Sequence, residues 1–161
     1  MTDEKKYRVE SDLLGELKVP ADALYGVQTQ RGINNYHISR KTMVDNPDFI
    51  IAIAYVKLAA IETNHSLGVI NDEISGAISQ ACREIIDGKW HENFPIDMVQ
   101  GGAGTSVNMN ANEVIANRAL EPVTAVIIGV FVFGESFTFQ LAIGIAAILA
   151  GVTLIIARKK G

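Results

Sequence analysis

Apolar positions in the first two thirds of the chain follow helical patterns. The first pattern begins with Asn46, Pro47 and Asp48, a combination of cap, proline and acid that is typical of a helix N-terminus. Residues 49–56 are then apolar without interruption, which predicts a helix buried nearly all round. Lys57 interrupts the run too early for a membrane-spanning segment.

A second helix is predicted to start near Asn71 and to stop at Gly88. Its apolar face is made of four residues, Ile74, Ile78, Ala81 and Ile85. Cys82 lies beside that face and is interpreted as a small core residue.

Short extended segments are predicted before these helices. Leu13-Leu14-Gly15 and Val19-Pro20 indicate two such pieces around a turn, because proline disfavours helix at the residue before it. Residues 1–8 are polar, and we expect them to be frayed.

The stretch 100–112, QGGAGTSVNMNAN, joins a glycine-rich turn to a third helix. Its glycines allow left-handed backbone angles and close approach of a ligand; they are Gly101, Gly102 and Gly104. Thr105 and Ser106 follow as hydroxyl residues that favour a helix N-cap. The helical pattern then continues through Val107, Ala111, Val114 and Ile115.

The N-terminus of that third helix is a candidate binding site. Free backbone N–H groups and the positive end of the helix dipole would face the glycine turn, an arrangement that suits a carboxylate. A plain capped turn without a ligand explains the local pattern equally well, so both interpretations stay open at this point.

Residues 119–161 are almost uncharged until Arg158, Lys159 and Lys160. Residues 137–157 form an apolar run of about 21 residues, roughly 31 Å as a helix, which is enough to cross a hydrocarbon core. The preceding run, 123–133, is too short to span alone, and the two together predict a helical hairpin in a membrane. The closing cations predict a cytoplasmic C-terminus. The N-terminal part lacks a secretion signal, and we expect it in the cytoplasm as well.

Charge and cysteine content narrow the possible partners. Residues 1–118 carry 11 Lys and Arg against 16 Asp and Glu without a basic patch, which argues against nucleic acid. Cys82 is the only cysteine, so an intrachain disulfide is impossible. His37, His65 and His91 show no metal-ligand spacing, and no metal site is predicted.

The glycine stretch also carries a family resemblance. GGAGTSVNMNANEVIANRA resembles the first signature region of the aspartase/fumarase superfamily, and GGAGTSVNMN is more similar to aspartate ammonia-lyases than to fumarases. The resemblance extends upstream through DLLGELKVPADALYGVQTQRGINNYHIS and covers roughly residues 7–118. It implies a mainly α fold, a truncated N-terminal helical domain with short extended segments at its start.

Such proteins convert aspartate to fumarate and ammonia without an organic cofactor, so the resemblance implies no cofactor here. It implies that the glycine–threonine region contacts the substrate, with Thr105 as the best match. Further substrate-binding candidates are Gly104, Ser106, Asn108 and Asn110. Arg31 could assist a carboxylate, although an ion pair is its favoured role. No residue of this chain is assigned as catalytic.

Active sites in this family combine three regions from different subunits of a tetramer. The two later regions, one of which carries the base, have no match in this chain. The resemblance therefore implies no turnover by the chain alone. L-Aspartate or fumarate would bind only if other subunits completed the site, in a homo-oligomer or in a mixed tetramer with an intact lyase.

The tail is similar to the last two membrane helices of drug/metabolite transporter superfamily proteins. The matching marks are LEPV at 120–123, Gly134-Glu135 and AGV at 150–152. We therefore predict two joined parts, a lyase-like region 1–118 and a transmembrane hairpin 119–161. Three functions remain open: an inactive enzyme fragment with a membrane tail, a transporter fragment, and an interaction module that docks into an intact lyase.

Overall fold

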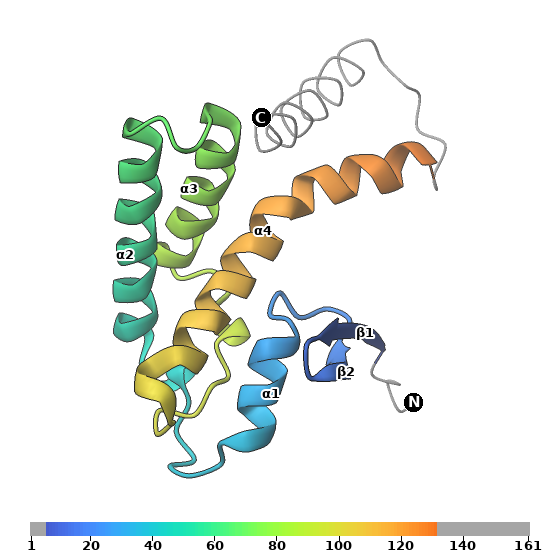
Figure 1. Ribbon diagram of the computed structural model, residues 1–161, viewed down its shortest axis with the longest axis vertical. Coiled ribbons are helices and arrows are strands. Elements are labelled where there is room, and N and C mark those ends of the chain that lie inside the picture. Colours follow the sequence, from blue (N-terminus) through green and yellow to red (C-terminus); the bar gives the residue numbers. More distant parts are fainter. Residues whose placement is uncertain (1–5, 132–161) are drawn as a thin grey trace.

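The computed structural model describes residues 6–131, and side chains within residues 6–121. This part is mainly helical, with a β-hairpin at its N-terminal end (Figure 1). The strands and α-helices are β1 (Tyr7–Asp12), β2 (Gly15–Pro20), α1 (Val27–Asn35), α2 (Pro47–Ser66), α3 (Asp72–Ile86) and α4 (Thr105–Phe131). Short 3-10 turns occur at η1 (Met43–Asp45), η2 (His91–Asn93) and η3 (Gly102–Gly104). The predicted class, mainly α with extended segments first, is confirmed for these residues.

The N-terminal hairpin pairs β1 with β2 in antiparallel register, Tyr7 opposite Pro20 and Asp12 opposite Gly15. Gly15 closes the turn with φ of 108°, a value that residues with a side chain rarely adopt. The prediction that residues 1–8 are frayed is wrong for Tyr7 and Arg8, which belong to β1. Arg8 donates hydrogen bonds to the carbonyl of Pro20 at the end of β2 and to those of Ala23 and Tyr25 after it, and these bonds hold β1 in place.

Helix α2 starts where the sequence predicts, with Asn46 as N-cap residue and Pro47 at the first helical position. The predicted burial on all sides is wrong. Ile50 and Ala54 are buried, but the side chain of Val56 is 66% exposed. The physical reason is that α3 pairs with one side of α2, and the elements described here leave the opposite side open (Figure 1).

Helix α3 starts next to Asn71, as predicted, and the Asn71 side chain caps it by accepting a hydrogen bond from the N–H of Ile74. Ala81 and Ile85 of the predicted apolar face are buried, whereas Ile74 at the helix start is exposed. Cys82 is fully buried in the core, as predicted, and burial raises the pKa of its thiol to about 11.

The hydrophobic core lies between α2, α3 and α4 and is closed by the segment that precedes the glycine turn. Phe94 and Ile96 of that segment are buried. The α4 residues that the sequence pattern assigned to the core are all buried as well, namely Val107, Ala111, Val114 and Ile115. Gly32 lets α1 approach closely, since a Cβ there would lie 2.6 Å from Cδ1 of Ile96.

Helix α4 crosses the molecule and continues beyond the other elements (Figure 1). It passes without interruption through the predicted boundary between residues 118 and 119. Arg118 joins α4 to α3: it forms a two-pronged ion pair with Glu84 at 2.6 and 2.9 Å and lies 5.3 Å from the ring centre of Trp90. Among the described residues, no helix is long and apolar enough to cross a membrane. The predicted span 137–157 lies outside them.

Candidate functional site

The glycine turn, residues 101–104, carries three consecutive left-handed backbone positions. Gly102 and Gly104 have φ of 73° and 85°, as the sequence predicts, whereas Gly101 does not. Ala103 between them has φ of 52°, which costs a residue with a side chain about 1–2 kcal/mol. Gly101 lies close to another side chain: a Cβ there would lie 3.2 Å from the hydroxyl of Tyr36, a tight contact.

The first turn of α4 is capped by a residue that the sequence pattern did not reveal. The side-chain oxygen of Gln100 accepts the N–H of Val107 at 3.0 Å. The predicted hydroxyl cap is wrong, because the Thr105 hydroxyl donates to the carbonyl of Gly102 at 2.5 Å and stabilises the turn instead. Gln100 reaches back from outside the helix, a contact that only the folded turn creates.

Asp97 holds the segment before the turn in place. Its carboxylate accepts the N–H groups of Ile38, Ser39 and Val99 and the hydroxyl of Ser39, at distances from 2.6 to 2.9 Å. The hydrogen bond from the Ser39 hydroxyl is the largest cause of a pKa lowered to about 2. The segment that carries Gln100 is therefore fixed against the chain that precedes α2.

The candidate site residues fall into three different environments. Gly104, Thr105 and Asn108 are exposed at the N-terminal end of α4, and Ser106 is half-buried beside them. Asn110 is fully buried, where its amide donates to the carbonyl of Asn93 at 2.9 Å and its oxygen has no hydrogen-bond partner. The structure thus places four of the candidates at the N-terminal end of α4, with Ser106 towards Gly32 of α1 and Asn108 towards Lys57 of α2, and it places Asn110 in the core.

Arg31 lies apart from the glycine turn and holds α1 against the hairpin. Its guanidinium binds Asp12 through two hydrogen bonds of 2.9 and 2.7 Å and also donates to the carbonyl of Gly15. The hydrogen bond to Asp12 raises the pKa of Arg31, and the same bond lowers the pKa of Asp12. This geometry matches the ion-pair role favoured from the sequence.

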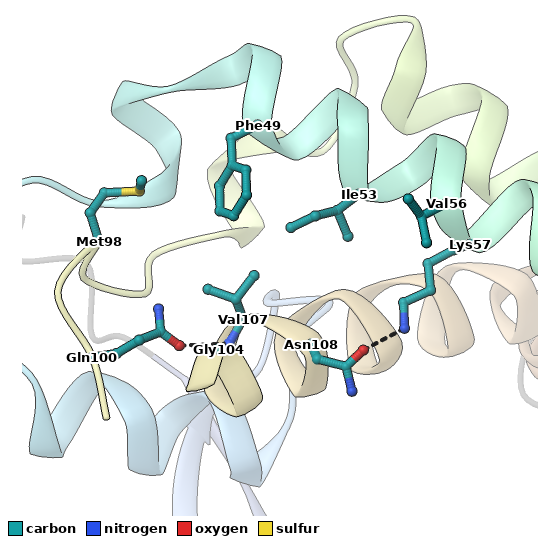
Figure 2. Close-up of a pocket in the computed structure, with 9 residues that line it drawn as sticks. All are labelled: Phe49, Ile53, Val56, Lys57, Met98, Gln100, Gly104, Val107 and Asn108. Carbon is teal, nitrogen blue, oxygen red and sulfur yellow. Dashed lines mark hydrogen bonds between the residues drawn. The ribbon is translucent and has the colours of Figure 1, made fainter. Parts of the chain in front are cut away.

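An apolar groove of about 470 Å³ opens next to the glycine turn, between α2 and α4 (Figure 2). Its lining residues are Phe49, Ile53, Val56, Lys57, Met98, Gln100, Gly104, Val107 and Asn108. Lys57 reaches across it and donates to the side-chain oxygen of Asn108 at 2.5 Å. In the sequence, Lys57 stands out only as a charged residue that ends an apolar run. That feature was the one signal that could have pointed to its place in the groove.

Two of the described histidines make local contacts. His65 contacts Asp72 at 2.6 Å, and His91 contacts the carbonyl of Ile85 at 2.8 Å. Across residues 6–121, no group of three or more His, Cys, Asp or Glu side chains is arranged to hold a metal ion.

Residues 15–130 match the sequence model of a protein family described as lyase. The chain belongs to this lyase family. It is 54% identical over 114 residues to the aspartate ammonia-lyase of Pseudomonas aeruginosa, an alignment that covers 71% of this chain and 24% of that enzyme. It is 49% identical over 121 residues to the aspartate ammonia-lyase of Bacillus subtilis, covering 75% of the chain and 25% of the enzyme.

Solved structures agree with this family membership. The crystal structure of a fumarate lyase:delta crystallin from Brucella melitensis matches with a TM-score of 0.71 and 47% identity, over 74% of this chain and 28% of that one. A class II fumarase from Schistosoma mansoni matches with a TM-score of 0.70 and 38% identity, over 74% and 25%. This lyase-family chain spans about a quarter of the length of the curated relatives it matches.

A second family model, of EamA-like transporters, matches residues 107–157. The two matches share residues 107–130, all of which belong to α4. The resemblance of the N-terminal part to lyases is therefore confirmed, while the membrane tail stays a prediction.

Proposed function

We propose that this chain is the N-terminal fragment of an aspartate ammonia-lyase, able to contribute a carboxylate-binding turn but not to complete a catalytic site. The observation that carries the proposal is the identity of about half of all residues to aspartate ammonia-lyases over 114–121 positions. The glycine turn and the first turn of α4, which carry the family resemblance, form an exposed helix N-terminus within this region.

The proposed ligand is a carboxylate group of aspartate or fumarate. The turn places the exposed Gly104 and Thr105 at the positive end of α4, where backbone N–H groups attract anions. A fully charged dicarboxylate would be held only weakly there, because one helix end with a hydroxyl supplies few donors. We propose roles for Thr105, Gly104, Ser106 and Asn108 in such contacts, and a structural role for Asn110.

Turnover needs more than this turn. Removing the proton beside the side-chain carboxylate of aspartate requires a positioned base and donors for the resulting negative charge. Proximity and preorganised charge supply most of the acceleration in such a reaction. We therefore propose that the chain alone releases no ammonia from L-aspartate and forms no fumarate.

The binding experiment uses the full chain and measures fumarate binding by the shift of backbone amide NMR signals in residues 101–108. Thr105→Ala should weaken the response. Thr63→Ala is the matched control, because Thr63 is also exposed and its hydroxyl also donates to a backbone carbonyl, that of Ala59. Equal responses in both variants, or shifts confined to other residues, would contradict the binding role of Thr105.

The catalytic experiment measures ammonia release from L-aspartate by the purified chain, alone and after refolding with an intact aspartate ammonia-lyase. The chain alone should be inactive. If mixed oligomers form, Thr105→Ala in this chain should lower the activity of only those sites that borrow it. Turnover that copurifies with the chain alone and survives Thr105→Ala would overturn the fragment proposal.

A second candidate function concerns the C-terminal part. The match of residues 107–157 to EamA-like transporters supports a membrane-inserted tail. We propose a cytoplasmic C-terminus for it because of the cations Arg158, Lys159 and Lys160. Recovery of the full chain in the membrane fraction after carbonate washing would support it, and recovery in the soluble fraction would contradict it. Retention of an intact lyase by the tagged chain would instead favour a docking role.

A further inference from the structure

The apolar groove between α2 and α4 has one polar end, where Lys57 and Asn108 supply mainly hydrogen-bond donors. Among the nine residues that line the groove, Lys57 carries the only charge. Five others are large apolar side chains: Phe49, Ile53, Val56, Met98 and Val107. Figure 2 shows these apolar side chains along the groove, with Lys57 and Asn108 meeting at one end of it.

The remaining polar side chain of the groove, Gln100, is already used within the fold. Its oxygen accepts the N–H of Val107 and its amide donates to the carbonyl of Asp97 at 3.0 Å. Gln100 therefore shapes the groove without offering a free group to a ligand.

Lys57 and Asn108 are only partly used. The ammonium of Lys57 has three N–H donors and uses one of them to donate to the oxygen of Asn108. The amide nitrogen of Asn108 carries two donors, for which no acceptor lies within the described part of the chain. Lys57 occupies one of the two lone pairs of the Asn108 oxygen, so the N–H donors left at this end outnumber the acceptors, and one donor group is cationic.

From this inventory we infer that the groove binds a carboxylate attached to an apolar body of medium length. The carboxylate would accept from Lys57 and Asn108, and the hydrocarbon would lie along Phe49, Ile53 and Val56. A volume of about 470 Å³ is within the range of small-molecule sites, which are mostly apolar with a few placed polar groups.

This site differs in chemistry from the carboxylate-binding turn proposed above. Aspartate and fumarate have no apolar body to cover Phe49 or Ile53, so the apolar lining of the groove adds nothing to their binding free energy. The inference does not depend on the lyase function: the groove can bind its ligand in a chain that never meets aspartate.

The test is photolabelling of the full chain with an octanoate that carries a diazirine in its hydrocarbon chain, followed by mapping of the labelled peptides. Labels are expected on residues 49–57 and 98–108. Unlabelled octanoate should compete at least about tenfold better than octanol, because a charge-assisted hydrogen bond is lost with the carboxylate. Octylamine should compete poorly, since its ammonium would face Lys57.

Variants separate the polar end from general apolar binding. Lys57→Met keeps the length of the side chain but removes the donor, and should lower the apparent affinity for octanoate about ten- to a hundredfold. Lys57→Arg should retain most of it. Lys89→Met, at an exposed lysine outside the groove, is the matched control and should behave like the unmodified chain.

Octanol competing as well as octanoate in the unmodified chain would overturn the inference, and this comparison needs no variant to fold. Labels confined to residues outside the groove would overturn it too, as would unchanged affinity in a folded Lys57→Met variant. If fumarate competes with the probe as well as octanoate does, the groove and the turn are one dicarboxylate site and the apolar ligand is wrong.

Discussion

The carboxylate of Glu113 accepts hydrogen bonds from both the backbone N–H and the hydroxyl of Thr29, at 3.0 and 2.6 Å. It also accepts the N–H groups of Gly26 and Gln28, each within 2.9 Å. One side chain of α4 thus caps the N-terminus of α1, and its negative charge complements the dipole of that helix. A Cβ on Gly26 would lie 2.8 Å from the carboxylate of Glu10 and 2.9 Å from that of Glu113, so a larger residue there would displace these carboxylates.

Glu113→Gln should lower the free energy of unfolding by about 1–2 kcal/mol, because the amide replaces one acceptor oxygen by a donor that faces N–H groups. The measurement is urea unfolding followed by the fluorescence of Trp90, the only tryptophan. Glu16→Gln changes the same charge at an exposed position of β2 and should shift stability by less than about 0.5 kcal/mol. Equal effects of the two substitutions would show that the capping contacts contribute nothing.

The second prediction concerns pH and the ion pair that fastens α4 to α3. The Arg118 guanidinium is the main cause that lowers the pKa of Glu84 to about 2, from an ordinary value of 4.5. A carboxylate with a lowered pKa in the folded state stabilises the fold above its ordinary pKa. That contribution is lost as the pH falls from 4.5 towards about 2.

The Glu84→Gln variant should therefore be less stable than the unmodified chain at neutral pH, by about 1–3 kcal/mol. This difference in stability should shrink as the pH is lowered from 4.5 towards about 2. Far-UV circular dichroism is the suitable probe, because the Trp90 indole itself donates to Glu84. A stability difference that stays constant over this pH range would contradict the linkage.

The two glycines Gly32 and Gly76 offer a matched test of packing, since both lie inside helices. A Cβ at Gly32 would meet Cδ1 of the fully buried Ile96 at 2.6 Å, whereas a Cβ at Gly76 would meet nothing within 4 Å. Gly32→Ala should destabilise the chain by about 1–3 kcal/mol. Gly76→Ala should stabilise it by about 0.5–1 kcal/mol, because alanine loses less backbone freedom on folding. Thermal or urea unfolding measures the change in the free energy of unfolding for each variant. Changes of the same sign in both variants would refute the packing argument.

Local sequence signals predicted the helices α2 and α3 and the N-terminal turn well. Asn71 and Pro47 act within one turn of their own helix, so the pattern alone locates these starts. The contacts that fix the glycine turn and α1 were not predictable in the same way. Glu113 caps a helix 84 residues earlier in the chain, and Gln100 caps α4 from outside it. Such contacts depend on which elements meet in space, which periodicity does not encode.

In the candidate site, too, some features follow from the local sequence and others depend on the surrounding structure. The left-handed angles of Gly102 and Gly104 follow from residue type, but Ala103 adopts one as well because its neighbours force the turn. The pattern placed Asn108 and Asn110 together as polar helix positions. In the structure they point to different surroundings, one into the groove and the other into the core, since positions two apart lie on different faces of a helix.

Cys82 provides the last prediction, a test of how tightly the core of residues 6–121 is packed. An apolar face of α2 without a complete cover favours a loosely packed or oligomeric N-terminal part. The structure leaves one side of α2 exposed, yet it buries Cys82 completely between α2, α3 and α4, with a pKa raised to about 11 by burial.

In the folded chain the thiol of Cys82 should react with iodoacetamide at least about a hundredfold more slowly than free cysteine at the same pH, because the nucleophile is the thiolate. Mass spectrometry of the full chain over time gives the rate. Addition of urea up to the unfolding transition should raise it to the rate of free cysteine, which serves as the internal control. Rapid modification without urea would show that the α2–α3–α4 core opens readily, and would favour loose packing of the N-terminal part.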